Sequence, residues 1–272
     1  GLSNLSVSSI EEDKYGFLWF ATQGGLNRYD GKEFEIFRNN PFNEEGLVNN
    51  LIQTTFYDDE NHEIWLGTYQ GISRYIISED RFINYHSGEE GLSNQIVTAI
   101  SKDSQGYYWA GTLEGLNRID GETGEIVQYQ INGNVVRDIL LDSKDRLILA
   151  TYEGIMLYNQ EKDLVEPLNI NLPSKFVMVI KEFQPGIITG GLWDGGIFEY
   201  NFNTEELKSW EFSNNNIYTI EKTKDNTLWA GSWGGGLFSL TEEGEIYEIH
   251  SGNKTNQVSH PVVYSLLEDN SG

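Results

Sequence analysis

The amino-acid sequence predicts an all-β protein, a β-propeller of four-stranded blades with six complete blades and the first strand of a seventh. Three observations lead to this prediction. The sequence repeats itself about every 40 residues, each repeat holds four short runs rich in β-branched and aromatic residues, and Gly, Asn and Asp separate these runs. Four strands in a repeat of this length are typical of a propeller blade.

One position recurs in every repeat and defines the interval. In chain order it holds Trp19, Trp65, Trp109, Ile148, Thr189 and Trp229. The steps range from 39 residues, between Trp109 and Ile148, to 46 residues, between Trp19 and Trp65. No segment carries an apolar stripe of helical spacing long enough for a helix, so we assign the repeat to strands. We interpret the recurring aromatic residue as core that packs one sheet on the next.

The first repeat shows the order of the elements within a blade. A first strand ends near Asp13, a second runs over 18–22, a turn ends at Gly25, and two further strands follow at 26–29 and 34–37. Applied to the whole chain, this order gives six blades over 1–257. Their approximate ranges are 1–45, 46–90, 91–132, 133–172, 173–212 and 213–257.

An acidic residue opens the turn between the first and second strands of several repeats. We place it at Asp13, Asp59, Asp103 and Asp142. Because the residue recurs from blade to blade, we interpret it as Asx-type turn chemistry and not as a calcium site.

Residues 258–272 are expected to hold only the first strand of a seventh, truncated blade. Leu266 and Asp269 take the places that Ile10 and Asp13 have in the first repeat. We expect sequence outside this chain to complete that blade, and the incomplete edge to be open to pairing with another strand.

The charge of the chain excludes several classes of partner. It contains 42 acidic and 18 basic residues, for a net charge of −24. Such a surface repels phosphate backbones, anionic lipid and sulfated polysaccharides, so we expect no nucleic acid partner and no membrane contact. Neutral sugars, cations and basic protein surfaces remain open. The chain has no cysteine, which excludes disulfides and thiolate metal sites.

The repeats resemble those of the two-component regulator propeller family. The motif Gly-Leu-Ser-Asn, then Leu-Trp-x-Gly-Thr, then Gly-Leu-x-Arg-Tyr recurs with small variations at 1–30, 46–75 and 91–118. Repeats four and five depart from it, with Ile148 and Thr189 at the tryptophan position. The resemblance covers essentially the whole chain.

This resemblance implies a sensor. Propellers of this family usually lie in the periplasm, ahead of an immunoglobulin-like domain, a membrane helix and a cytoplasmic output that is commonly a histidine kinase and sometimes a diguanylate cyclase. In gut bacteria, many of them detect oligosaccharides. The implied role is a non-enzymatic, extracytoplasmic segment that binds a small molecule or oligosaccharide, needs no cofactor, and can dimerise through its parent protein.

Two alternatives stay open. The first is an enzyme of the streptogramin-lyase type, which shares the scaffold and needs a histidine base with a metal. The four histidines, His62, His86, His250 and His260, show no paired ligand spacing, so we assign neither a catalytic residue nor a metal ligand. The second is a passive scaffold or dimerisation module without a small-molecule site.

Candidate ligand-binding residues lie in the turns between the second and third strands. In blades five and six this turn gains one residue and an extra tryptophan. The predicted ligand-binding residues are Trp193, Asp194, Trp233, Tyr152, Glu153 and Tyr69. Aromatic rings stack on the C–H faces of a neutral sugar, and carboxylates accept hydrogen bonds from its hydroxyls. The competing interpretation is that the two tryptophans only pack on the next blade.

Overall fold

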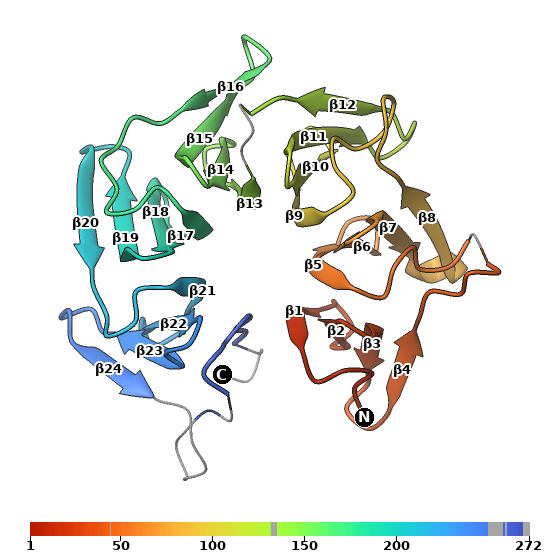
Figure 1. Cartoon of the computed structure of the whole chain (residues 1–272), viewed down its shortest axis with the longest axis horizontal. Helices are drawn as coiled ribbons and strands as arrows, with labels where there is room; N and C mark the ends of the chain where they lie inside the picture. The colour runs from red at the N-terminus through yellow and green to blue at the C-terminus, as the bar shows by residue number, and fades with distance from the viewer. Residues whose placement is uncertain (44, 132–134, 250–257, 259, 269–272) are drawn as a thin grey trace. The chain divides into compact units, whose positions relative to one another are not determined.

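The computed structural model describes residues 1–272 apart from 44, 132–134, 250–257, 259 and 269–272. The described residues form six antiparallel sheets of four strands, and consecutive strands are neighbours in each sheet (Figure 1). Such sheets are the blades of a β-propeller, so the predicted fold class is confirmed. Among the described residues, no helix is long and apolar enough to cross a membrane, and one short 3-10 helix, η1 (Ile77–Glu79), is present.

The chain divides into two compact units, Gly1–Ile139 and Leu140–Gly272, with the boundary inside β13. The first three blades are formed by β1 (Val7–Glu12), β2 (Leu18–Thr22), β3 (Gly25–Tyr29) and β4 (Phe34–Phe37); β5 (Ile52–Asp58), β6 (Glu63–Thr68), β7 (Gly71–Ile76) and β8 (Arg81–Tyr85); and β9 (Val97–Lys102), β10 (Tyr107–Thr112), β11 (Gly115–Asp120) and β12 (Ile126–Tyr129). The last three are formed by β13 (Val136–Leu141), β14 (Leu147–Thr151), β15 (Gly154–Asn159) and β16 (Leu164–Pro167); β17 (Val177–Gln184), β18 (Ile187–Leu192), β19 (Gly196–Asn201) and β20 (Glu206–Trp210); and β21 (Ile217–Lys222), β22 (Leu228–Ser232), β23 (Leu237–Leu240) and β24 (Ile246–Ile249).

The recurring tryptophans of the first unit fill the space between neighbouring sheets. Trp65 is fully buried, and its indole stacks between Tyr85 of blade 2 and Tyr108 of blade 3 at centre distances of 5.4 and 3.9 Å. Trp19 meets Tyr75 of blade 2 at 6.0 Å. Aromatic pairs of this kind add about 0.5–1.5 kcal/mol to the gain from burial. The interpretation of these tryptophans as core is confirmed.

The acidic residue of the first turn holds both the turn and the tryptophan. Asp13 Oδ1 accepts the backbone N–H groups of Tyr15 and Phe17 at 2.9 and 3.0 Å. Its Oδ2 accepts the indole N–H of Trp19 at 2.9 Å. Asp103 makes the equivalent bonds in blade 3. These are Asx-type turns, as predicted.

In blade 2 the turn residue is Asp58, and the prediction of Asp59 is wrong. The hairpin between β5 and β6 is one residue longer, because Trp65 pairs with Phe56 and the turn residue lies seven positions before the tryptophan instead of six. Asp58 is 2% exposed and accepts the N–H of Glu60 at 3.1 Å, whereas Asp59 is exposed. Counting back a fixed distance from Trp65 missed the inserted residue.

The carboxylate of Asp58 serves the interface between blades 2 and 3 instead of its own tryptophan. It accepts hydrogen bonds from the Tyr108 hydroxyl, from Lys102 Nζ at 3.0 Å and from Asn61 Nδ2 at 2.9 Å. Among the described residues, the buried Trp65 indole N–H has no hydrogen-bond partner. Burial raises the pKa of Asp58, but these hydrogen bonds outweigh burial and hold that pKa below its ordinary value.

In the second unit, a backbone hydrogen bond ties the turn between strands two and three of a blade to the loop leading into the next blade. The N–H of Gly154 donates to the carbonyl of Lys175 at 2.8 Å, and that of Gly196 to Asn215 at 3.1 Å. The following strands, β17 and β21, each begin two residues after the acceptor. This bond therefore marks where the first strand of the next blade starts.

The C-terminal segment makes the same bond with blade 6. The N–H of Gly236 donates to the carbonyl of Pro261 at 2.9 Å, so the equivalent strand start is Val263. A Cβ placed on Gly231 of β22 would lie 2.7 Å from Val263 Cγ1, so only glycine allows this close approach. Val263 thus occupies the position that a first strand takes against the preceding blade.

The predicted seventh-blade strand itself does not form over the described part of 258–272. Val262 makes an isolated bridge with Trp233, and residues 263–268, which include Leu266, carry no strand assignment. Asp269, the predicted turn residue, lies outside the described residues. A strand needs a neighbour to satisfy its backbone groups, and no second strand of a seventh blade lies within the described residues.

Candidate functional site

The turns between the second and third strands of blades 5 and 6 are longer than those of the other blades. In blade 1, Thr22 pairs directly with Gly25 across the turn, whereas in blade 5 Leu192 pairs with Gly196. Trp193 is the first residue of this longer turn. The equivalent turn of blade 6 carries a tryptophan in the same way, so the predicted insertion is present in the structure.

Four aromatic side chains of the second unit gather around these two turns. They are Trp193, Tyr218, Trp233 and Tyr264, which we call the aromatic cluster. The ring centre of Trp233 lies 6.2 Å from Trp193, 6.1 Å from Tyr218 and 5.5 Å from Tyr264. Trp233 is 41% exposed, and the other three rings are half-buried. The cluster is therefore a solvent-accessible aromatic surface and not part of a closed core.

Asparagines in the loop before β21 hold the two turns in place. The backbone N–H of Asp194 donates to Asn216 Oδ1 at 3.0 Å, and that of Trp233 to the Asn216 carbonyl at 2.9 Å. Asn214 Nδ2 donates to the carbonyl of Trp233 at 3.2 Å. Asp194 has a φ of 59°, in the left-handed region, and its side chain is exposed. The tryptophans are thus fixed at their backbones before any ligand arrives, with an exposed carboxylate beside them.

The remaining predicted residues are not members of this cluster. Tyr152, in the turn between β14 and β15, packs edge-on against Phe176 at 5.4 Å, and Glu153 pairs with Lys175 at 3.2 Å. Phe176 is 47% exposed, so this pair extends the aromatic surface of the second unit. Tyr69 belongs to the first unit, where it is an exposed residue of the turn between β6 and β7.

Sequence reasoning missed Tyr218 and Tyr264. Both follow the first residue of a first-strand pattern, in the matching stretches 217–220 and 263–266. Their rings meet edge-on at 5.4 Å. A tyrosine repeated at one register of two consecutive blades was the available signal.

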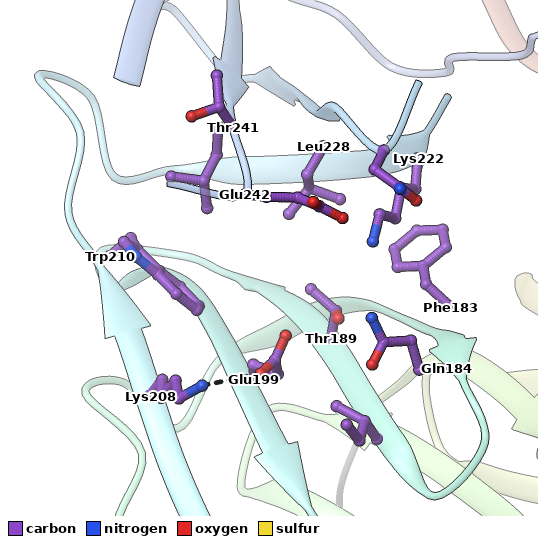
Figure 2. A pocket seen from close by; sticks show the side chains of 13 residues that line it. Phe183, Gln184, Thr189, Glu199, Lys208, Trp210, Lys222, Leu228, Thr241 and Glu242 are labelled. Atoms are coloured by element: carbon purple, nitrogen blue, oxygen red, sulfur yellow. Dashed lines mark ion pairs between the residues drawn. The ribbon is translucent and has the colours of Figure 1, made fainter. Parts of the chain in front are cut away.

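A groove lies between blades 5 and 6, away from these turns. This interblade groove has a volume of about 280 Å³. Figure 2 shows Thr189, Glu199 and Trp210 of blade 5 facing Leu228 and Glu242 of blade 6 across it. Lys208 Nζ and Glu199 Oε1 form a loose ion pair at 3.7 Å along its rim.

The described histidines make separate local contacts. Tyr57 is hydrogen-bonded to His62 Nδ1 at 2.9 Å, and His260 Nδ1 accepts the N–H of Val262 at 3.1 Å. His250 lies outside the described residues. In the described part of the chain, no group of three or more His, Asp or Glu side chains is arranged to hold a metal ion.

Comparison with known sequences relates the repeats to signalling proteins. Residues 1–24, 91–114 and 211–234 match the family model described as two component regulator propeller. A stretch of 41 residues is 58% identical to histidine kinase P4 of Formosa agariphila, and it covers 15% of this chain and 3% of that protein.

Comparison of structures gives the same relationship over the whole chain. The chain is similar to the extracellular domain of a protein from B. thetaiotaomicron that is assigned as a hybrid two component system, with a TM-score of 0.85 and 25% identity over 99% of this chain and 38% of that chain. The chain thus spans well under half of that domain.

A catalytically inactive virginiamycin B lyase from Staphylococcus aureus, solved with quinupristin, has a TM-score of 0.75 and 16% identity over 95% of this chain and 87% of that chain. This likeness is one of fold alone. Three segments of the chain thus match two-component regulator propeller repeats, and the whole chain is similar in structure to the extracellular domain of a two-component system.

Proposed function

We propose that this chain is the ligand-sensing, extracytoplasmic propeller segment of a bacterial two-component-type receptor, and that it binds a neutral oligosaccharide at the aromatic cluster. The receptor role is supported by the repeat family and by the extracellular domain from B. thetaiotaomicron. The same relationship supports a periplasmic location. Signal output belongs to other parts of the parent protein, so this segment binds and does not catalyse.

The observation that carries the ligand class is the exposed cluster of rings on blade 6 and its neighbours. Trp233 presents 41% of its surface while its turn is fixed by hydrogen bonds to Asn214 and Asn216. Rigid, exposed indoles stack on the apolar faces of sugar rings at little cost in side-chain entropy. Asp194 adds an acceptor for sugar hydroxyls. The net charge of −24 favours a neutral sugar over a sulfated or uronic one.

Two other functions are less well supported. A lyase activity rests on neighbours that are 16% identical, whose likeness is one of fold alone, and no metal-binding group of His, Asp or Glu lies among the described residues. A passive scaffold gives no reason for two lengthened turns that expose tryptophan. If these rings served only to pack one blade on the next, they would be buried, as Trp19 and Trp65 are.

The test is calorimetric titration of the chain with neutral oligosaccharides, including gluco-, xylo-, manno- and galacto-oligosaccharides. Trp193→Ala and Trp233→Ala are each expected to weaken binding roughly tenfold or more, because each removes a stacking face. Trp210→Ala is the matched control, since it removes a half-buried tryptophan of the same unit outside the cluster. Thermal melts confirm folding. If both cluster variants bind a sugar as tightly as the parent chain, the cluster is not the site.

A further inference from the structure

The interblade groove between blades 5 and 6 lies beside a position at which the repeat lacks its tryptophan. Thr189 stands at the position that Trp65 has in blade 2, since Thr189 pairs with Glu199 on β19 just as Trp65 pairs with Arg74 on β7. Thr189 is 5% exposed and lines the groove. Threonine is much smaller than tryptophan, so this position holds less side-chain volume in blade 5 than in blade 2.

The residues around Thr189 correspond in register to those that surround Trp65 in blade 2. In blade 2, Trp65 stacks on Tyr85, which pairs with Ile72 on β7. In blade 5 the equivalent residue of β20 is Trp210, which pairs with Ile197. A flat aromatic face therefore remains on one side of this position.

The opposite wall of the groove also has an apolar side chain. Trp65 contacts Tyr108 of the next blade at 3.9 Å, with an angle of 22° between the rings. Leu228 of β22 has the place of Tyr108, directly before the anchor tryptophan of its own blade. Leu228 is an apolar surface for the second face of a ring. The groove is thus lined by Trp210 on the side of blade 5 and by Leu228 on the side of blade 6, and we call the space between them the slot.

The polar groups of the slot differ from those of blade 2 in a way that selects the ligand. In blade 2 the Arg74 guanidinium lies over the Trp65 ring, 5.2 Å from its centre. In blade 5 Glu199 takes that place, and within the described part of the chain its carboxylate pairs with Lys208 at 3.7 Å, outside ideal hydrogen-bond distance. An acceptor therefore replaces a donor at the edge of the slot.

We propose that the interblade groove is a second binding site, for a small planar aromatic molecule that carries an N–H or O–H donor, such as an indole or a phenol. The ring lies between Trp210 and Leu228, and its donor bonds to the Glu199 carboxylate. Phe183, at the bulge of β17, lies at the other end of the groove from Trp210 and bounds the site there (Figure 2).

The experiment uses three probes on the whole chain: indole, 1-methylindole and cyclohexanol. Binding is measured by calorimetry and by ligand-observed saturation-transfer NMR. Indole is expected to bind, 1-methylindole to bind roughly tenfold more weakly because it lacks the N–H donor, and cyclohexanol to give no saturable signal because it is not planar. Failure of indole to bind up to its solubility limit, or equal binding of cyclohexanol, overturns the proposal.

Variants locate the site. Thr189→Trp restores the repeat's own side chain to the slot and is expected to abolish indole binding. Trp210→Ala and Glu199→Gln are expected to weaken binding roughly tenfold each, and they keep the test decisive if Thr189→Trp does not fold. Trp193→Ala must leave indole binding unchanged. A folded Thr189→Trp variant that still binds indole, or loss of indole binding in Trp193→Ala, overturns the proposal. Oligosaccharide binding at the aromatic cluster is read independently of all these outcomes.

Discussion

Blade 2 and blade 5 are built from the same repeat and differ in what fills the space beside the next sheet. In blade 2, Trp65 occupies that space and is stacked on both faces by tyrosine. In blade 5, Thr189 occupies the same register and a groove of about 280 Å³ remains. The sheets have the same strand order in both blades. The four-stranded scaffold therefore tolerates the loss of its main anchor without a change of fold. A groove of about 390 Å³, lined by Arg74 and Tyr108, also lies between blades 2 and 3, so the two grooves differ in their lining and not in their presence.

The ion pair of blade 2 is also closer and more buried than the ion pair of blade 5. Glu63 and Arg74 of blade 2 meet at 2.7 Å with both side chains at most 14% exposed, and Arg74 also covers the indole of Trp65. Glu199 and Lys208 of blade 5 are 3.7 Å apart and far more exposed. Blade 2 thus buries its ion pair, whereas blade 5 leaves its ion pair exposed to solvent.

The largest expected effect is on the anchor itself. Trp65→Ala is expected to lower the free energy of unfolding by about 3–5 kcal/mol, because it removes a fully buried indole and leaves a cavity. Thr189→Ala, at the same register of blade 5, is expected to cost less than about 1 kcal/mol. Urea unfolding followed by circular dichroism measures both. Equal losses for the two variants would show that the anchor position does not distinguish the blades.

The next effect concerns the carboxylate behind the anchor of blade 2. Asp58→Asn is expected to cost about 2–3 kcal/mol at pH 7, since the buried partners Tyr108 and Lys102 lose a charged acceptor. Asp59→Asn, one residue on and exposed, is the matched control and is expected to change stability by less than about 0.5 kcal/mol. Reversed effects would mean that Asp59 is the turn residue after all.

The pH dependence of that effect follows from the sign of the shift. The pKa of Asp58 is lower in the folded than in the unfolded chain, because the hydrogen bonds to its carboxylate outweigh burial. Its contribution is therefore fully present above its unfolded pKa of about 3.9 and is lost as the pH falls through the folded value. The stability difference between the parent chain and Asp58→Asn is expected to be constant from pH 7 to 5 and to shrink below about pH 4. A difference that stays constant down to pH 2 contradicts this.

Filling the groove beside blade 5 is expected to have a smaller effect of the opposite sign. Thr189→Trp is expected to raise the free energy of unfolding by about 1–2 kcal/mol, because the new indole is buried against Trp210 and Leu228. Thermal and urea unfolding measure the gain. A clear loss of stability would show that the walls of the groove are too close for a ring, and it would count against an aromatic ligand as well.

The smallest expected effect is on the exposed ion pair of blade 5. Lys208→Ala is expected to change stability by less than about 0.5 kcal/mol, since the pair is loose and solvated. A double-mutant cycle with Glu199→Gln measures the coupling between the two side chains. A coupling above about 1 kcal/mol would mean that the pair closes the groove more firmly than its separation of 3.7 Å indicates.

Local features of the sequence determined much of this molecule in advance. Alternation of apolar residues gave the strands, Asx chemistry gave the turns at Asp13 and Asp103, and the extra residue before Gly196 gave the longer turn that carries Trp193. These features depend on neighbours within a few residues along the chain, so their physical causes are present in the sequence itself. The error of placing the turn residue at Asp59 instead of Asp58 came from a hairpin with one additional residue.

Only the tertiary structure decided which side chains meet. The contact of Trp233 with Trp193, the position of Tyr264 beside Tyr218, and the hollow opposite Leu228 all join residues about one blade apart in sequence. A small residue such as Thr189 at the tryptophan position can leave either a groove or a collapsed core. Which of the two forms depends on how closely the two sheets approach each other. That distance is set by the packing of every side chain between the sheets, and no single repeat contains both walls.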